Sequence, residues 1–547
     1  MPASITPAGP AEPQADSVGD AATAPPVRSV LPCRARWWGL TGSTLLAVGA
    51  LGAGVLPRPE ALADAPVLRL LRDGAGVPIC VGVAAIGAAV WVAAWWSLRP
   101  VTAMVRHPQH SARWIGVTAA VWSLPLALAP PLLSRDVYSY AAQGQVAAHG
   151  RNPYEYGPAE FSSDWAAPDW AESVSPSWSF SPAPYGPLFV IVARGAAMLG
   201  EATGRIEVAV LALRLVTIGA VALLAVYLPR LARHCGVAPG QAQWLAIGCP
   251  LLLVHSVSGA HNDVIMLALV VAGLVYLARH RPIPAGLLLG AAVAVKAPAL
   301  LMLPFAVLLA VALAYRAGAS RAACVRRAGA MMAVAGVSLT GFTLAAGFGW
   351  GWINALSTPG ASVQWTSLPT SWGIAVSWLT DPFVVPGDDN TAVTVARGIG
   401  AALLAMLLLA IWARTAWHVL RTRRTANPSD TPATREEAAE PSQPWITRTV
   451  VQACGAALLA LALLAPAFHP WYFLWPLVLL AASVRHHIGR AALAVTAGAL
   501  CFLVLPGGYN LARITAPVGV IAVVVGTVVL SIAVVVTLAR RSASYQH

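Results

Sequence analysis

The stretch IEVAVLALRLVTIGAVALLAVYLP, residues 206–229, is apolar over a length that can cross a lipid bilayer. A helix needs roughly 20 such residues to span the hydrocarbon core, and shorter runs suffice in tightly packed bundles. Similar runs occur along the whole chain, at 38–56, 77–97, 114–133, 242–258, 264–278, 284–296, 298–315, 329–349, 391–413, 449–466, 470–484, 491–506 and 517–538. The sequence therefore predicts an all-α integral membrane protein, a helical bundle with about 12–14 transmembrane helices.

The composition supports this fold class. Of the 547 residues, 58% are hydrophobic and only 10% are charged, whereas a soluble domain carries about 25% charged residues. The net charge of +13 comes from short basic clusters between apolar runs, which is the pattern of membrane topology signals. Membrane lipids are thus the expected surroundings, and no nucleic acid is expected as a partner. The seven cysteines are scattered without metal-ligand spacing, which predicts neither a zinc site nor a disulfide framework.

The basic clusters also predict the orientation. If the N-terminus is cytoplasmic, clusters such as Arg99–Arg113, Arg230–Arg233, Arg316–Arg327 and Arg414–Arg424 all fall on the cytoplasmic side, as the positive-inside rule requires. Both termini are then cytoplasmic and the protein is a multi-pass protein of the plasma membrane.

This topology divides the chain into segments of different character. Two of them, 134–205 and 350–390, are long extracytoplasmic loops, and the semi-apolar stretch 185–199 in the first is expected to be a juxtamembrane helix. The remaining segments are a disordered cytoplasmic tail (1–36), N-terminal transmembrane helices (37–133), central transmembrane helices (206–349), one transmembrane helix (391–420), a cytoplasmic linker (421–447) and C-terminal transmembrane helices (448–547).

Ionisable residues gather near the outer ends of the predicted helices, where they are costly and are therefore candidates for function. Asp136 begins the first outer loop, and a carboxylate there can serve as the catalytic general base. Five cations on the same side can hold a phosphate: Arg135, His261, Lys296, His469 and Arg513. Aromatic and amide side chains suited to binding a sugar or acceptor are Tyr138, Tyr140, Gln143, Asn152, Tyr154 and Tyr185.

Each candidate also has a structural explanation. Asp136 can pair with Arg135, Lys296 can extend to the membrane interface, and Trp and Tyr are enriched at interfaces in any case. The two histidines can be hydrogen-bonded structural residues. For Asp263 we favour a helix cap over catalysis, and Arg513 can be an interfacial anchor.

Several motifs resemble one enzyme family. The stretch SRDVYSYAAQGQVAAHGRNPYEYGP (134–158) resembles the first outer loop of the actinobacterial polyprenyl-phosphomannose-dependent α-1,6-mannosyltransferases of the GT-C superfamily. Similar elements are Leu-Arg-Leu (213–215), YGPLF (185–189), HNDVIMLAL (261–269), AVKAPALLMLP (294–304) and HPWYFLWP (469–476). Two extra spans before the Asp136 loop depart from the simplest GT-C plan; they are taken as an N-terminal addition, and the sequence assigns them no purpose.

The resemblance implies a GT-C-type fold and a glycosyltransferase acting on the outer face. Mannose would pass from polyprenyl-phosphomannose to a mannosylated phosphatidylinositol or lipomannan acceptor, on the way to lipoarabinomannan in the cell envelope. The family's catalytic carboxylate maps onto Asp136, and inversion at the anomeric carbon needs one base and no covalent intermediate. No cofactor is required, and no metal is indicated, although Asp136 and Asp263 could in principle hold a divalent ion.

Two other functions remain open at this point. One is a GT-C transferase for another lipid-linked sugar, polyprenyl-phosphoarabinose or polyprenyl-phosphoglucose. The other is a lipid or sugar transporter, which would often show repeated halves with interrupted helices; the sequence shows no such repeat.

Overall fold

The computed structural model describes residues 30–58, 66–100, 102, 108–161, 170–361, 363–380, 390–421, 443–507 and 515–543. These residues form helices joined by turns and loops, with no β-strand among them. The all-α prediction is thus confirmed.

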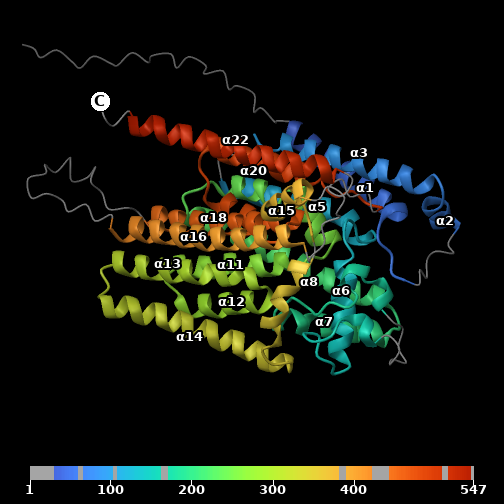
Figure 1. Cartoon of the computed structure of the whole chain (residues 1–547), viewed down its shortest axis with the longest axis horizontal. Coiled ribbons are helices and arrows are strands. Elements are labelled where there is room, and N and C mark those ends of the chain that lie inside the picture. Colours follow the sequence, from blue (N-terminus) through green and yellow to red (C-terminus); the bar gives the residue numbers. More distant parts are fainter. Residues whose placement is uncertain are drawn as a thin grey trace, which may run out of the picture.

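Long apolar helices form most of the molecule and run roughly along its long axis (Figure 1). Within the described residues, six helices are long and apolar enough to cross a membrane: α3 (Gly76–Ser97), α8 (Ile206–His234), η5 with α13 (Ala297–Arg316), α14 (Arg321–Ala346), α16 (Thr391–Arg421) and α18 (Gln443–Leu464). A bent pair, Pro250–Ser258 with Asp263–Ala278, makes a seventh if it is one span. The protein is therefore a multi-spanning membrane protein.

The other predicted spans correspond to helices that are shorter, less apolar or partly outside the described side chains. Pro282–Val295, Pro470–Ser483 and Ala516–Val529 are short apolar helices. By element, these and the remaining helices of the bundle are α1 (Val30–Ala53), α2 (Pro66–Arg72), α5 (Pro108–Leu128), α9 (Pro239–Leu245), α10 (Pro250–Leu253), η4 (Val254–Ser258), α11 (Asp263–Ala278), α12 (Pro282–Val295), η7 (Pro470–Phe473), α19 (Leu474–Ser483), α20 (His487–Leu500) and α22 (Ala516–Ala543).

Some boundaries differ from the predicted ones. The first helix begins at Val30, inside the predicted tail, and α15 (Leu368–Thr380) lies in a segment predicted to be a loop. The predicted span 242–258 is interrupted between α9 and α10, where Pro250 begins a new helix. Most of the predicted tail and of the 421–447 linker lies outside the described residues.

The segment 134–205 forms a helical cap at one end of the molecule, on the right in Figure 1. Its two main helices are α6 (Asp136–Ala148) and α7 (Pro187–Ala202). They can pack closely because Gly144 has no side chain, and a Cβ at this position would collide with the backbone of Ala193. Short turns η1 (Pro158–Phe161), η2 (Ala171–Ser173) and η3 (Pro176–Trp178) lie between them, and η6 (Gly351–Ala361) follows α14. The predicted juxtamembrane helix is α7, which at 16 residues is too short for a full span.

Candidate active site

A sharp break in the bundle lies behind the site. The chain turns by 117° between the helix pair ending at Ser258 and the helix beginning at Asp263, and Ala260 adopts a positive φ of 50° in the turn. Residues 254–258 form a π-helical turn, a feature often found at functional sites. His261, Asn262 and Asp263 are all fully buried there.

Arg214 of α8 holds this break in place. Its guanidinium donates hydrogen bonds to the carbonyl oxygens of Ala127 and Ala129, each at 2.9 Å, and to that of Ser258 at 3.0 Å. One buried cation thereby joins the end of α5 to the turn, at a point where backbone carbonyls have no helical partner. Arg214 belongs to the Leu-Arg-Leu element, and no role was predicted for it from the sequence.

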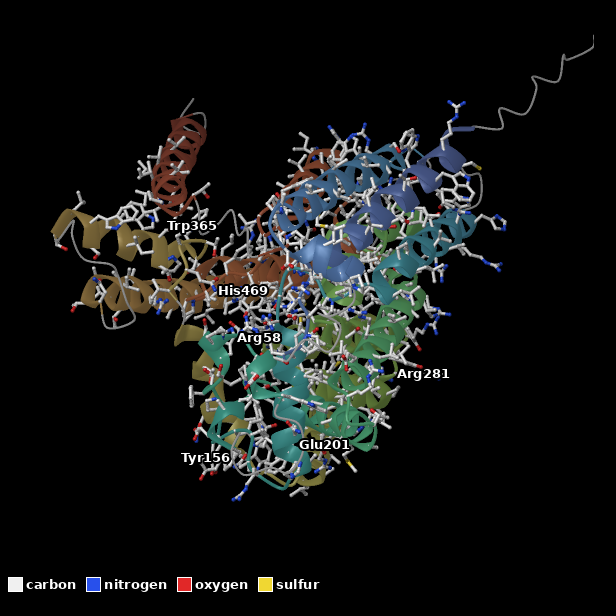
Figure 2. All side chains as sticks on the ribbon, turned by 90° about the vertical axis from the view of Figure 1, so that its right-hand side faces the viewer. Arg58, Tyr156, Glu201, Arg281, Trp365 and His469 are labelled. Carbon is white, nitrogen blue, oxygen red and sulfur yellow. The ribbon has the colours of Figure 1, made fainter. Side chains whose placement is uncertain are left out.

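A cavity of about 650 Å³, partly open to solvent, lies between the helical cap and the break. Its residues come from α6, the loop before α7, the end of α12, η6 and the 469–472 turn. They are Asp136, Ser139, Gln143, Trp178, Ser181, Pro182, Pro184, Tyr185, Lys296, Thr358, His469, Trp471 and Tyr472. Figure 2 looks onto this end of the molecule, with His469 near its middle and Tyr156 and Glu201 at the edge of the cap.

Asp136 is the one carboxylate among the described residues that line this cavity. It is the first residue of α6, and its side chain is 22% exposed, with Oδ2 at 3.5 Å from Nδ1 of His261. Burial raises the pKa of the Asp136 carboxyl above its ordinary value. A higher pKa makes the carboxylate a stronger base, which favours proton abstraction near neutral pH.

Lys296 faces the same cavity but is held by a buried partner. Its Nζ donates to both oxygens of Asp263 at 2.9 Å, and the indole of Trp475 donates to Asp263 Oδ1 at 2.6 Å. The Asp263 side chain is fully buried, whereas that of Lys296 is 12% exposed. Asp263 therefore pairs with Lys296 and does not cap α11 as the sequence suggested.

The indole bond to Asp263 should contribute to stability. We expect Trp475→Phe to lower the free energy of unfolding by about 2 kcal/mol, because a hydrogen bond to a buried charge is worth roughly 1.5–3 kcal/mol. Denaturant titration of the detergent-solubilised protein measures this. Trp412→Phe is the matched control, since its indole donates to a neutral carbonyl, that of Pro304, at an exposed position, and an equal loss in both variants would contradict the assignment.

Aromatic rings stack at one wall of the cavity. Trp471 lies between two histidines, with ring centroids 4.4 Å from His469 and 4.1 Å from His261. His469 lines the cavity, but His261 lies behind it, fully buried. The stack fixes both imidazoles and brings His261 to Asp136.

Two polar side chains of α6 offer unused hydrogen-bonding atoms at the cavity wall. Ser139 Oγ and Gln143 Oε1 are buried and have no hydrogen-bond partner within the described part of the chain. Buried polar atoms are normally paired, so these two are suited to bind hydroxyl groups of a ligand.

The structure brings together some predicted residues and not others. Asp136, Gln143, Tyr185, Lys296 and His469 all line the cavity, whereas Arg513 lies outside the described residues. The remaining predicted residues contact other groups. Arg135 donates to Leu56 O and Ser173 O, and the Tyr138 hydroxyl donates to Val55 O. The Tyr140 hydroxyl lies 3.5 Å from His261 Nδ1, Asn152 donates to Glu155, and the ring of Tyr154 packs against that of Phe348.

Several cavity residues were not predicted. Ser139, Thr358, Trp471 and Tyr472 line the wall, and Trp475 holds Asp263 from behind. Three of these aromatic residues lie in HPWYFLWP, so the density of rings in that motif was a usable signal. Nothing in the sequence marks Ser139 or Thr358.

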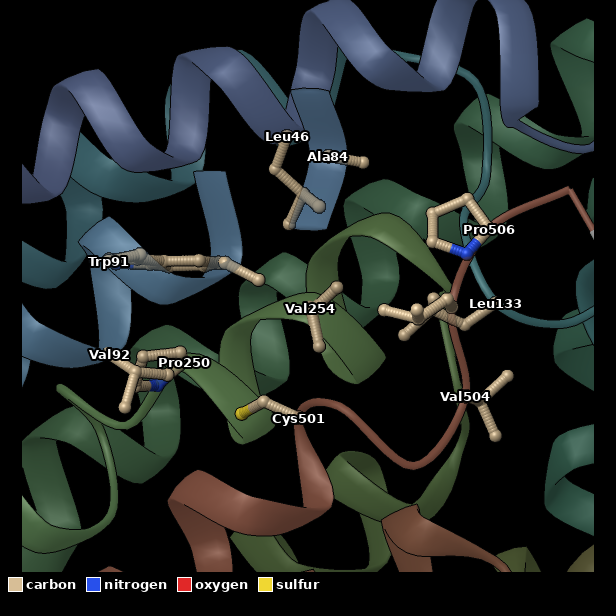
Figure 3. Close-up of a pocket in the computed structure, with 12 residues that line it drawn as sticks. Leu46, Ala84, Trp91, Val92, Leu133, Pro250, Val254, Cys501, Val504 and Pro506 are labelled. Carbon is tan, nitrogen blue, oxygen red and sulfur yellow. The ribbon is translucent and has the colours of Figure 1, made fainter. Parts of the chain in front are cut away.

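A second cavity, of about 360 Å³, lies between the N-terminal helices and the break. Figure 3 shows its apolar wall, which includes Leu46, Trp91, Leu133, Val254 and Cys501. No Asp, Glu, His, Lys or Arg stands among its described lining residues, so the cavity at Asp136 is the candidate active site.

Comparison with known proteins then identifies the family. The family profile described as "Alpha-(1->6)-mannopyranosyltransferase, N-terminal domain" matches residues 36–312, and that of the "MptB C-terminal domain" matches residues 444–537. The chain belongs to the α-(1→6)-mannopyranosyltransferase family. The first match covers most of α1, the Asp136 loop, the break and Lys296, whereas His469 and Arg513 lie within the second.

Relatives in the α-(1→6)-mannopyranosyltransferase family match over most of the chain. A protein of Mycolicibacterium smegmatis, named "Probable alpha-(1->6)-mannopyranosyltransferase", is 34% identical over 85% of this chain and 81% of its own length. Alpha-(1->6)-mannopyranosyltransferase A of Mycobacterium tuberculosis is 30% identical over 84% of this chain and 81% of its own. Alpha-(1->6)-mannopyranosyltransferase B of Corynebacterium glutamicum is 28% identical over 88% and 77%. No solved structure matches the chain.

Proposed function

We propose that this protein transfers mannose from polyprenyl-phosphomannose to a mannosylated phosphatidylinositol or lipomannan acceptor, forming α-1,6 linkages. One observation carries the proposal: a single carboxylate, Asp136, and a lysine, Lys296, line the same cavity together with aromatic rings. A transfer from a lipid phosphate needs a base for the acceptor hydroxyl and a cation for the leaving phosphate. The names of the family relatives supply the sugar and the linkage.

The reaction is a single displacement. Asp136 takes the proton of the acceptor 6-hydroxyl, and that oxygen attacks the anomeric carbon of the donor mannose. The bond between the anomeric carbon and the phosphate oxygen breaks, and polyprenyl phosphate leaves with the bonding electrons. A β-linked donor thereby gives an α-linked product, as expected for one base and no covalent intermediate.

The charges of the site support this division of roles. Asp263 does not line the cavity and is neutralised by Lys296, so it is poorly placed as a second catalytic carboxylate. Lys296 keeps a surface toward the cavity and can hold the phosphate as charge develops on it. His469 borders the same space and can donate a hydrogen bond to the phosphate.

The other predicted phosphate ligands take different places in the proposal. His261 contacts Asp136 and orients the carboxylate instead of binding phosphate. Arg513 stays a predicted phosphate ligand. Gln143 and Tyr185 remain the predicted acceptor and sugar contacts at the cavity wall, and Ser139 joins them through its unpaired hydroxyl.

We further propose that the cavity faces the outside of the plasma membrane, with both termini in the cytoplasm. The helical cap and the cavity lie at one end of the bundle. The clusters of arginine fall in segments that the alternation of helices assigns to the other side, in agreement with the positive-inside rule. Such an arrangement gives the cavity access to lipids of the outer leaflet.

A panel of donors tests the proposal. The purified protein in lipid nanodiscs is given a short α-1,6-linked mannoside as acceptor and one donor at a time: polyprenyl-phosphomannose, polyprenyl-phosphoarabinose, polyprenyl-phosphoglucose or GDP-mannose. We expect transfer from polyprenyl-phosphomannose alone. Preferential use of another lipid-linked sugar, or use of GDP-mannose, would overturn the proposed donor, and movement of lipid across the membrane without transfer would favour a transporter.

A further inference from the structure

The segment that follows α1 lies against the start of the helix that carries Asp136. We call residues Val55–Arg58 the strap. It forms hydrogen bonds with residues before and after Asp136 in the sequence. Val55 N donates to Pro131 O at 2.8 Å, and Arg135 Nη1 donates to Leu56 O at 3.3 Å. The Tyr138 hydroxyl donates to Val55 O at 2.9 Å. The strap thus holds the chain before Asp136 and the residues on both sides of it.

Ser173 connects the strap to the later part of the helical cap. Arg58 N donates to Ser173 Oγ at 2.8 Å, and that hydroxyl donates back to Arg58 O at 3.3 Å. Arg135 Nη1 also donates to Ser173 O, at 2.9 Å. Three segments distant in sequence therefore meet beside Asp136, and Ser173 is fully buried among them. Arg58 is labelled in Figure 2.

The helices that precede the strap and pack beside it are attached to the rest of the bundle by hydrogen bonds. The indole of Trp95 in α3 donates to Trp244 O at 2.7 Å, and the indole of Trp244 donates to Trp95 O at 2.8 Å. Trp122 donates to Arg36 O at 2.9 Å, which ties α1 to α5. Gly42 lets the backbones of α1 and α3 approach so closely that a side chain there would collide with Trp91 N. The N-terminal helix pair is thus fastened to the rest of the bundle, and its outer end is the strap.

We propose that the strap, with Tyr138, Arg135 and Ser173, positions the Asp136 carboxylate across the cavity from Lys296. This inference rests on the proposed role of Asp136 as the base. It assigns a purpose to the two N-terminal helices, and it makes Arg135 and Tyr138 positioning residues where the sequence suggested contacts with phosphate and sugar. Arg135, Tyr138 and Ser173 do not line the cavity.

The energetic consequence follows from the sensitivity of catalysis to geometry. A base displaced by about 1 Å from its productive position can cost on the order of 10²-fold in rate. Loss of one strap contact should therefore lower kcat, while KM for the donor changes little because the phosphate is held elsewhere. A purely structural contact would instead lower the melting temperature without separating kcat from KM.

Two variants remove single strap contacts, and each has a matched control. Tyr138→Phe deletes the hydroxyl bond to Val55, and Tyr227→Phe deletes a hydroxyl bond to Tyr276 remote from the site. Ser173→Ala deletes the bonds to Arg58, and Ser43→Ala deletes the bond of a fully buried hydroxyl within α1. Mannosyl transfer gives kcat and KM, and hydrogen exchange of peptides covering 134–140 reports how firmly the start of α6 is held.

We expect both strap variants to lower kcat by about 10- to 100-fold at nearly constant donor KM and to speed hydrogen exchange at 134–140. The two controls should match wild type in both readouts. Unchanged kcat in the strap variants would overturn the inference, as would a fall in stability alone.

The exchange measurement separates this inference from the proposed function. If the wild-type protein transfers no mannose from any donor, the proposed function fails. Hydrogen exchange at 134–140 alone then tests whether the strap holds the start of α6. Faster exchange at 134–140 in the strap variants, with the controls unchanged, would then support a strap that holds the start of α6. Exchange equal to wild type would overturn it.

Discussion

Asp136→Asn should reduce kcat for mannosyl transfer by about 10²- to 10⁴-fold, the usual contribution of a general base. The substitution keeps the size of the side chain and its place at the start of α6 but removes the ability to accept the acceptor proton. Donor binding should persist, because Lys296 and His469 are unchanged. Steady-state kinetics with lipid-linked donor, together with donor binding measured separately, gives both quantities.

Asp73→Asn is the control for this prediction. Asp73 is a carboxylate outside the cavity, in an exposed pair with Arg69 in which both side chains are more than two-thirds exposed, and such pairs contribute little to stability. Its substitution should leave kcat unchanged. Full activity of Asp136→Asn would remove Asp136 from the chemistry and direct attention to Asp263.

The second large effect concerns the buried pair of Lys296 and Asp263. Removing one partner of a buried ion pair costs about 3–5 kcal/mol, because the other charge is left without compensation. We therefore expect Lys296→Met and Asp263→Asn each to destabilise the protein by about that amount. The double variant should recover much of the stability, since no unpaired charge remains.

Activity should follow a different pattern in the same set of variants. Lys296→Met loses the cation proposed for the leaving phosphate, so kcat should fall by about 10²- to 10³-fold, as for other groups that stabilise a developing anion. The double variant should stay equally inactive despite its regained stability. If activity returned together with stability in the double variant, Lys296 would be a structural residue and the phosphate would be held elsewhere.

Much of the fold could be predicted because apolar runs in a membrane protein report helices directly. Every predicted span overlaps a helix, and the loop beginning at Asp136 does carry the cavity. Asp136, Lys296 and His469 were chosen as ionisable residues at helix ends, where charges are rarely kept without a use, and all three line one cavity.

The remaining features depend on tertiary partners that a single sequence does not show. Hydropathy separates the apolar runs 242–258 and 264–278 at this place, but it does not give the angle of 117° between the two helices. Arg135 and Tyr138 have the residue types of a phosphate and a sugar ligand, but backbone carbonyls of a distant segment, the strap, determine where they point. The pairing of Asp263 with Lys296 likewise joins residues from two helices whose relative placement only the structure gives.

The most direct test of the whole account is the anomeric configuration of the product from a single turnover. Purified protein is mixed with polyprenyl-phosphomannose, β-linked and labelled with ¹³C at the anomeric carbon, and with an excess of a short mannoside acceptor. We expect an α-1,6-linked product, visible by NMR, because the one carboxylate among the described cavity residues permits only inversion. A β-linked product would require a second nucleophilic carboxylate and would contradict the mechanism built on Asp136, and the absence of any transfer would contradict the proposed reaction itself.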